Sequence, residues 1–159
     1  MGDFTHIDSA GKVTMVDVTH KQETIRTARA RSVLFLPDAV MIHFANGDIH
    51  SKKGGVFQTA IIAGIMAAKK TGDLIPLCHP IGLSNTVIDI AVTGANEVEI
   101  ICKATVSAKT GVEMEAMVGA SIAALTVYDM CKAMSHEIVI KETKLIEKTG
   151  GKSDFKAKQ

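Results

Sequence analysis

Two long apolar segments on either side of a pair of alternating segments constrain the fold of this chain most. Residues 56–70 and 112–134 are rich in hydrophobic side chains, contain no proline and are long enough to predict helices. Between them, residues 83–92 and 97–106 alternate apolar and polar side chains with period two. The four residues that join the alternating segments include Gly94, so this part predicts an antiparallel hairpin between two helices.

Further elements are expected before and after this centre. Residues 31–36 and 137–145 alternate and predict strands, whereas residues 23–30 predict a short helix or helical turn. A second short helix is expected over residues 38–44, followed by a tight turn at Asn46-Gly47. The order βαββαβ indicates a ferredoxin-like α+β fold, one antiparallel sheet with its helices packed on one face.

This architecture has two consequences for size and assembly. A chain of 159 residues fits one domain, covering residues 1–159. The second face of the sheet is expected to stay uncovered in a monomer, and its alternate apolar residues predict association into a homo-oligomer. The tail from Lys148 onward is rich in glycine and lysine and is expected to be loose.

Composition excludes several classes of protein. Eighteen basic and seventeen acidic residues, one tyrosine and no tryptophan argue against a nucleic-acid-binding domain. Cys78, Cys102 and Cys131 lie far apart and form no CxxC, which indicates a reduced, cytoplasmic chain without a metal site. The longest apolar run, residues 60–68, is shorter than the roughly 20 residues that span a bilayer, so no membrane association is expected.

One face of the second long helix combines apolar and charged residues. Val118, Ile122, Leu125, Asp129 and Lys132 follow one another at steps of three and four, which places them on one helical face that we expect to face the core. Charges on such a face are costly unless they are paired or used in chemistry. Spacing alone favours an ordinary ion pair between Asp129 and Lys132, with a catalytic pair as the alternative.

Loops supply the other candidate groups. His79 lies in a loop bracketed by Pro76 and Pro80, where it could exchange protons or simply hydrogen-bond the backbone. Lys53 precedes two glycines at the start of the first long helix, which indicates either an anion site at the helix N-terminus or a solvated turn. The basic segment 148–153 is equally compatible with a phosphate clamp and a tail.

Two glutamates open the second long helix. Glu113 follows Thr110 by three residues, the spacing of a capping box. Glu115 has no such role, although carboxylates near a helix N-terminus are favourable in any case.

These groups occur within longer strings that resemble one family. The chain is similar to the cyclic pyranopterin monophosphate synthases, also called molybdenum cofactor biosynthesis protein C, along nearly its whole length. The similarity rests on stretches at residues 5–7, 15–18, 53–57, 62–65, 73–80, 109–116, 128–133 and 148–153. The strongest read DLIPLCHP, KTGVEMEA and YDMCKA.

The resemblance implies a reaction and an assembly. Members of the family convert 3′,8-cyclo-7,8-dihydroguanosine 5′-triphosphate into cyclic pyranopterin monophosphate and release diphosphate, as lyases without a redox cofactor. They adopt a ferredoxin-like fold and form hexamers, trimers of dimers, with sites near subunit interfaces. The expected partners are thus a small nucleotide-derived substrate and further copies of the chain.

The resemblance also implies residue roles. It assigns catalysis to Asp129, Lys132 and Lys53, and substrate binding to Leu77, Cys78, His79, Glu113, Met114, Glu115, Lys148 and Lys152. The chain departs from the family at Gly55 and Ile61, where Asp and Arg are usual, which affects the expected phosphate contacts.

Two rival functions stay open at this level. A nucleotide-binding regulatory module on the same fold would use the lysines without needing Asp129. A nucleic-acid-binding α+β domain would need the aromatic side chains that this chain lacks.

Overall fold

Five antiparallel strands and two long helices form the body of the molecule. The computed structural model of the chain describes residues 6–7 and 10–158, so Thr5 of the first similar stretch and Gln159 of the tail lie outside it. The strands follow the order β5-β6-β1-β7-β8. They comprise β1 (Thr24–Phe35), β5 (Asn85–Val92), β6 (Glu97–Ala108), β7 (Val139–Thr149) and β8 (Phe155–Lys156).

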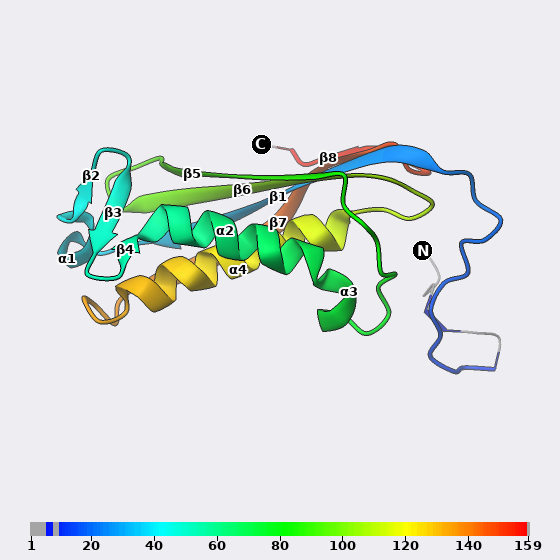
Figure 1. Ribbon diagram of the computed structural model, residues 1–159, viewed down its shortest axis with the longest axis horizontal. Helices are drawn as coiled ribbons and strands as arrows, with labels where there is room; N and C mark the ends of the chain where they lie inside the picture. The colour runs from blue at the N-terminus through cyan, green and yellow to red at the C-terminus, as the bar shows by residue number, and fades with distance from the viewer. Residues whose placement is uncertain (1–5, 8–9, 159) are drawn as a thin grey trace.

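Helices α2 (Val56–Lys69) and α4 (Glu113–Cys131) pack side by side on one face of this sheet (Figure 1). Strands β1, β5, β6 and β7 with these helices have the βαββαβ order, and the predicted ferredoxin-like α+β fold is confirmed. The short helix α3 (Thr71–Leu74) continues from α2.

A small second sheet is inserted between β1 and α2. It follows α1 (Asp38–Met41) and consists of β2 (Phe44–Ala45), β3 (Asp48–Ser51) and β4 (Gly54–Gly55). Its turn is the predicted Asn46-Gly47 pair, with φ angles of 54° and 82°. Two successive residues with positive φ between paired strands are typical of the tight hairpin turns that match strand twist.

The first strand is longer than the sequence indicated. Residues 24–30, expected as a helix, form the first half of β1, which pairs with β6 on one side and β7 on the other. Its side chains do alternate, because Ala28 and Ala30 are buried while Arg29 and Arg31 reach the open face. Pairing on both edges outweighs local propensity, and the small alanines hid the period of two.

The tail is also more ordered than expected. Lys148 and Thr149 complete β7, and β8 pairs with β7 through Glu147 with Lys156 and Lys148 with Phe155. The short strand therefore covers an edge that would otherwise expose unpaired backbone groups.

Helix α4 presents small residues to the core. Ala116, Ala120, Ala123 and Ala124 are buried, together with Gly119. A Cβ atom added to Gly64 of α2 would lie 2.7 Å from the carbonyl oxygen of Gly119, so the two helices approach closely. Although α4 is long and apolar enough to cross a membrane, half of it is buried inside the protein, as in the core helix of a globular domain.

The face of α4 that was predicted to lie in the core is instead directed toward solvent. Val118 and Ile122 are only partly buried, while Leu125 is 51% exposed and Asp129 and Lys132 are exposed. This prediction was wrong because close packing selects the small side chains of α4 for the inner face and leaves the larger ones outside.

The predicted capping box is likewise absent. The residue that caps α4 is Val112, and no side chain caps the helix. The Glu113 carboxylate instead accepts a hydrogen bond from Lys148.

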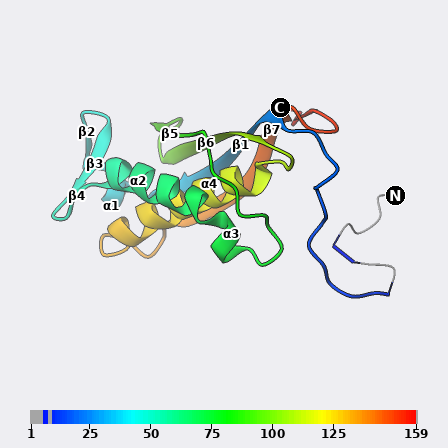
Figure 2. The same ribbon diagram turned by 45° about the vertical axis from the view of Figure 1, so that its right-hand side comes forward.

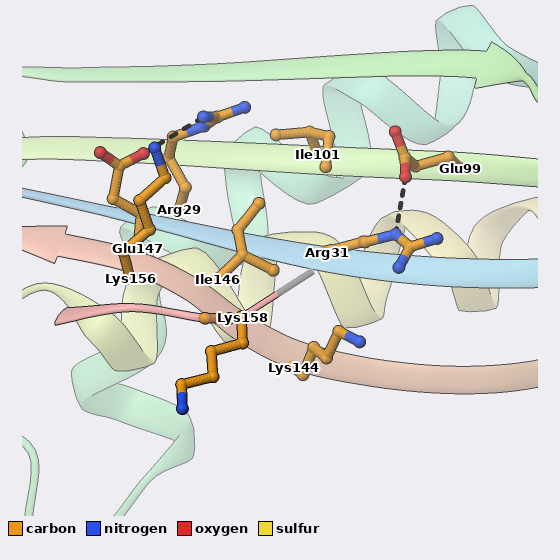
Figure 3. A pocket seen from close by; sticks show the side chains of 10 residues that line it. Arg29, Arg31, Glu99, Ile101, Lys144, Ile146, Glu147, Lys156 and Lys158 are labelled. Carbon is orange, nitrogen blue, oxygen red and sulfur yellow. Dashed lines mark hydrogen bonds and ion pairs between the residues drawn. The ribbon is translucent and has the colours of Figure 1, made fainter.

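The open face of the sheet is charged rather than apolar. Arg31 Nε lies 2.6 Å from Glu99 Oε2, and Arg29 Nη1 lies 3.2 Å from Glu147 Oε2 (Figure 3). These pairs line a depression of about 480 Å³ together with Ile101 and other side chains. The face is uncovered, as expected, but charged pairs rather than alternate apolar residues predominate on it. This face therefore gives no support for oligomer formation.

Candidate active site

A cavity of about 470 Å³ lies at the N-terminal end of α4. Seven of the eight residues predicted to bind substrate line it, and they come from the loop after α3, the first turn of α4 and the end of β7. They are Leu77, Cys78, His79, Glu113, Met114, Glu115 and Lys148. The fold thus brings together residues that are far apart in the sequence.

Local packing holds the loop after α3 against α4. The Cys78 N–H donates to the Ile75 carbonyl over 3.0 Å, which closes a turn. A Cβ atom at Gly72 would lie 3.1 Å from Pro80 Cα, so a larger residue there would push the loop a few tenths of an ångström away from α3. This turn places Cys78 and His79 at the mouth of the cavity.

Glu115 is the buried carboxyl group of the site, only 4% exposed. Burial raises its pKa, and the nearby Glu113 raises it further. The pKa of the Cys78 thiol is also raised, first by burial and then by the charge of Glu115. The thiol therefore stays protonated near neutral pH, which suits a lining group rather than a nucleophile.

A shallower depression of about 150 Å³ adjoins the cavity. It shares Gly111, Glu113 and Lys148 with the cavity and adds Arg26 and Lys152, the eighth residue predicted to bind substrate. Lys148 Nζ lies 2.9 Å from Glu113 Oε1. The cations of the depression outnumber its carboxylate, so it can hold an anion such as a phosphate chain.

The three residues predicted to be catalytic gather at the other end of α4. Lys132 Nζ lies 2.6 Å from Asp129 Oδ1. This hydrogen bond is the main reason why the pKa of Asp129 is lowered, and the charge of nearby Lys53 contributes. The same bond raises the pKa of Lys132. The ion pair that the spacing indicated is present, and it is exposed to solvent.

The predicted catalytic residues and the cavity residues do not meet within one chain. Asp129 follows Glu113 by 16 residues along the same helix, which corresponds to about 24 Å at 1.5 Å per residue. The cavity therefore contains neither Asp129, Lys132 nor Lys53.

The anion site expected beside Lys53 is already occupied by a side chain of the protein. The carboxylate of Asp48, which is buried, accepts the N–H groups of Phe57 over 2.7 Å and Gln58 over 3.3 Å. These are the free donors at the start of α2, so they are not available to a phosphate. Of the two alternatives that the sequence left open at Lys53, the structure therefore disfavours an anion site at the helix N-terminus. Sequence reasoning missed Asp48.

Sequence reasoning also assigned no role to the N-terminal segment. Val16, Val18 and Lys21 line the cavity together with the loop after α3. The only local signal was a short alternation of valines, which is too weak to place a segment in a site.

The described part of the chain offers no cluster of side chains suited to bind a metal ion. No three His, Cys, Asp or Glu side chains among residues 6–7 and 10–158 are grouped so that they could hold a metal ion.

Comparison with known proteins places this site in context. Residues 15–151 match the model of the MoaC family. A cyclic pyranopterin monophosphate synthase of Xanthomonas campestris pv. campestris is 50% identical over 154 residues, which cover 97% of this chain and 93% of the relative. Molybdenum cofactor biosynthesis protein 1 of Dictyostelium discoideum is 48% identical over 168 residues, covering 95% of this chain and 27% of that longer protein.

The matched residues include every residue that lines the cavity except His6, the adjoining depression up to Gly151 and the pair at Asp129. With a family model covering most of its length and relatives at about half identity, the chain belongs to the MoaC family.

Proposed function

We propose that this protein is a lyase that converts 3′,8-cyclo-7,8-dihydroguanosine 5′-triphosphate into cyclic pyranopterin monophosphate and releases diphosphate, in molybdenum cofactor biosynthesis. The full-length similarity to cyclic pyranopterin monophosphate synthases supports the reaction. The observation that carries it in the structure is the joining of a 470 Å³ cavity to a cationic depression.

The two spaces fit the two parts of such a substrate. The nucleoside part would occupy the cavity beside Leu77 and Met114, and the triphosphate would extend toward Arg26, Lys148 and Lys152. Cations fixed near the leaving diphosphate stabilise the negative charge that develops there.

The proton transfers of this rearrangement need groups with different proton affinities. Asp129 has a lowered pKa and stays ionised, whereas Glu115 has a raised pKa and holds a proton more readily. We assign Asp129, Lys132 and Lys53 to catalysis and the cavity residues to substrate binding. The reaction is redox-neutral and needs no redox cofactor.

The separation of these groups along α4 supports a site shared between two copies. Val118, Ile122 and Leu125 form the outward face of α4 that ends at Asp129, and α2 exposes Ile62 and Met66 nearby in the helical layer. If two α4 helices pack antiparallel about a two-fold axis, the Asp129 end of one copy meets the cavity of the other. This arrangement favours a homo-oligomer, and we propose the hexameric assembly of three such dimers.

Domain and location complete the proposal. We expect a single domain over residues 1–159 and a cytoplasmic protein without nucleic-acid or membrane partners. The free cysteines Cys78, Cys102 and Cys131 are compatible with a reducing compartment.

Turnover tests the proposal directly. Purified protein supplied with the cyclic guanosine triphosphate intermediate should release diphosphate and form the pterin product in equal amounts. Binding of the intermediate without diphosphate release would favour the regulatory module instead, because that function needs the cationic depression but not Asp129.

A further inference from the structure

Residues 14–23, here called the N-terminal strap, form one wall of the cavity without belonging to the body of the fold. Val16, Val18 and Lys21 line the cavity. All ten residues are described, and none of them lies in a helix or a strand. In Figures 1 and 2 the strap runs from the start of β1 past the end of the molecule where α3 and the first turn of α4 lie. The sheet and helices alone do not hold this wall in place.

Two side chains from the body of the protein fasten the strap. His79 Nε2 lies 2.8 Å from the carbonyl oxygen of Val16. Lys109 Nζ donates to the carbonyl oxygen of Thr19 over 2.8 Å. Because a carbonyl oxygen can only accept, Nε2 of His79 must carry the proton in this contact.

The strap between these anchors is locally stiff. The carboxylate of Asp17 accepts hydrogen bonds from the Thr19 N–H over 2.8 Å and from the Thr19 hydroxyl over 2.6 Å. Val16 and Val18 are partly buried, whereas Asp17 between them is exposed. The strap therefore behaves as a short stiff segment whose apolar side faces the cavity.

We propose that His79 is a positioning residue, which holds the strap closed over the bound ligand through the Val16 carbonyl. Its Nε2–H is engaged by the backbone of the strap rather than directed to the ligand. A segment held by a few hydrogen bonds at the protein surface opens locally at small cost. The strap therefore opens to admit the ligand and closes to exclude water from it.

This inference rests on the proposed function only for the identity of the ligand. The alternative role for His79, proton exchange with the ligand, predicts a different response to substitution. Glutamine can still donate an N–H group to the Val16 carbonyl but cannot exchange protons near neutral pH, whereas leucine can do neither. His79→Gln and His79→Leu therefore separate the two roles.

Trypsin cleavage after Lys21, followed by mass spectrometry, measures strap opening without any turnover. Cleavage of a locally opened segment follows the population of the open form. We expect His79→Gln to be cleaved at the wild-type rate and His79→Leu about tenfold faster, the effect of one lost hydrogen bond. Guanosine triphosphate should slow cleavage of the wild type and of His79→Gln more than that of His79→Leu.

Steady-state kinetics supply the second measurement. Holding the strap affects how tightly substrate is retained, so His79→Leu should raise KM by a larger factor than it lowers kcat, and His79→Gln should raise KM less than His79→Leu does. Lys109→Met removes the other anchor without altering a cavity-lining residue, and it should also speed cleavage.

Three outcomes would overturn the inference. The first is equal loss of kcat in His79→Gln and His79→Leu with cleavage unchanged, since that is the behaviour of a proton-transfer group. The second is unchanged cleavage in both His79→Leu and Lys109→Met. The third is cleavage of His79→Gln as fast as that of His79→Leu. Failure of the proposed reaction is distinct, because it abolishes turnover of the wild type and leaves the cleavage measurements intact.

Discussion

The two ends of α4 shift the pKa of a carboxyl group in opposite directions. At the C-terminal end of α4, Asp129 and Lys132 form an exposed ion pair that lowers the pKa of the carboxyl group. At the N-terminal end, Glu115 is buried and its pKa is raised. The same helix therefore carries two carboxyl groups with different behaviour: Asp129 stays ionised, whereas Glu115 resists ionisation.

This difference shows how environment divides chemical roles between identical functional groups. Pairs of carboxyl groups with pKa values moved apart are typical of sites that need both an acid and a base. Here Asp129 follows Glu115 by 14 residues along α4, about 21 Å at 1.5 Å per residue, so under the proposed shared site the two groups would act together only when two copies meet.

The largest effect is expected at the paired end. Asp129→Asn keeps the size of the side chain but cannot accept a proton, so kcat should fall by roughly 10²–10⁴-fold. Because the Asp129 side chain is exposed, the thermal unfolding temperature of the Asp129→Asn variant should match that of the wild type. Near-normal formation of the pterin product would remove Asp129 from the catalytic assignment.

Complementation tests whether the two ends work together across copies. Asp129→Asn and Lys148→Met should each be nearly inactive, yet a refolded equal mixture should recover about a quarter of wild-type activity. Random pairing makes half of the dimers mixed, and each mixed dimer has one intact site of its two. No recovery in mixtures proven to contain mixed dimers would show that each site belongs to one chain.

The proposed phosphate contacts lie at the cavity end of α4. Lys152→Met should weaken binding of a non-reacting guanosine triphosphate analogue by about ten- to a hundredfold, the value of one charge-assisted hydrogen bond. Lys158→Met removes the same charge on the open sheet face and serves as the matched control. Isothermal titration measures both, and equal affinities would place the triphosphate elsewhere.

The N-termini of α2 and α4 differ in capping, because a side chain caps α2 but none caps α4. Two substitutions test this difference. Asp48→Ala removes the buried cap of α2 and should cost about 1–2 kcal/mol of unfolding free energy. Thr110→Ala before α4 should cost less than about 0.5 kcal/mol, because no side chain caps that helix. Urea unfolding measures both, and similar losses would contradict the observed capping.

The smallest effect concerns the pH dependence of stability at Glu115. Between the unfolded pKa, near 4.5, and the raised folded pKa, the folded state binds more protons than the unfolded state. Stability from this group should therefore fall as pH rises through that interval. Glu115→Gln should remove this contribution, which urea midpoints measured from pH 4 to 8 can detect. If the stability of the variant fell by the same amount over this pH range, the pH dependence would come from other groups.

Much of the fold could be predicted because its signals are local. Val56–Lys69 and Glu113–Cys131 are long apolar helices, and the strands between them alternate clearly. The first half of β1 could not be predicted, because alanines at 28 and 30 carry little hydrophobic contrast and the strand depends on partners on both edges.

The site shows the same division between local and distant information. Residues 77–79 and 113–115 were predicted through their resemblance to a family, and the fold brings them to one cavity. Asp48 caps a helix that begins beyond an intervening hairpin, nine residues from Phe57, so no local pattern reveals it. The roles proposed for Lys53 and Asp129 would depend on a second copy of the chain, which one sequence does not describe.

The close approach of Asp48 to Gly55 limits which side chains residue 55 can carry while the cap of α2 stays in place. A Cβ atom at residue 55 would lie 2.5 Å from Asp48 Oδ2, so any side chain there collides with the buried carboxylate. A side chain at residue 55 is therefore compatible with this backbone only if the Asp48 carboxylate moves away from the N–H groups of Phe57 and Gln58. The absence of a side chain at residue 55 and the cap supplied by Asp48 are thus coupled, so a larger residue at 55 should weaken the start of α2.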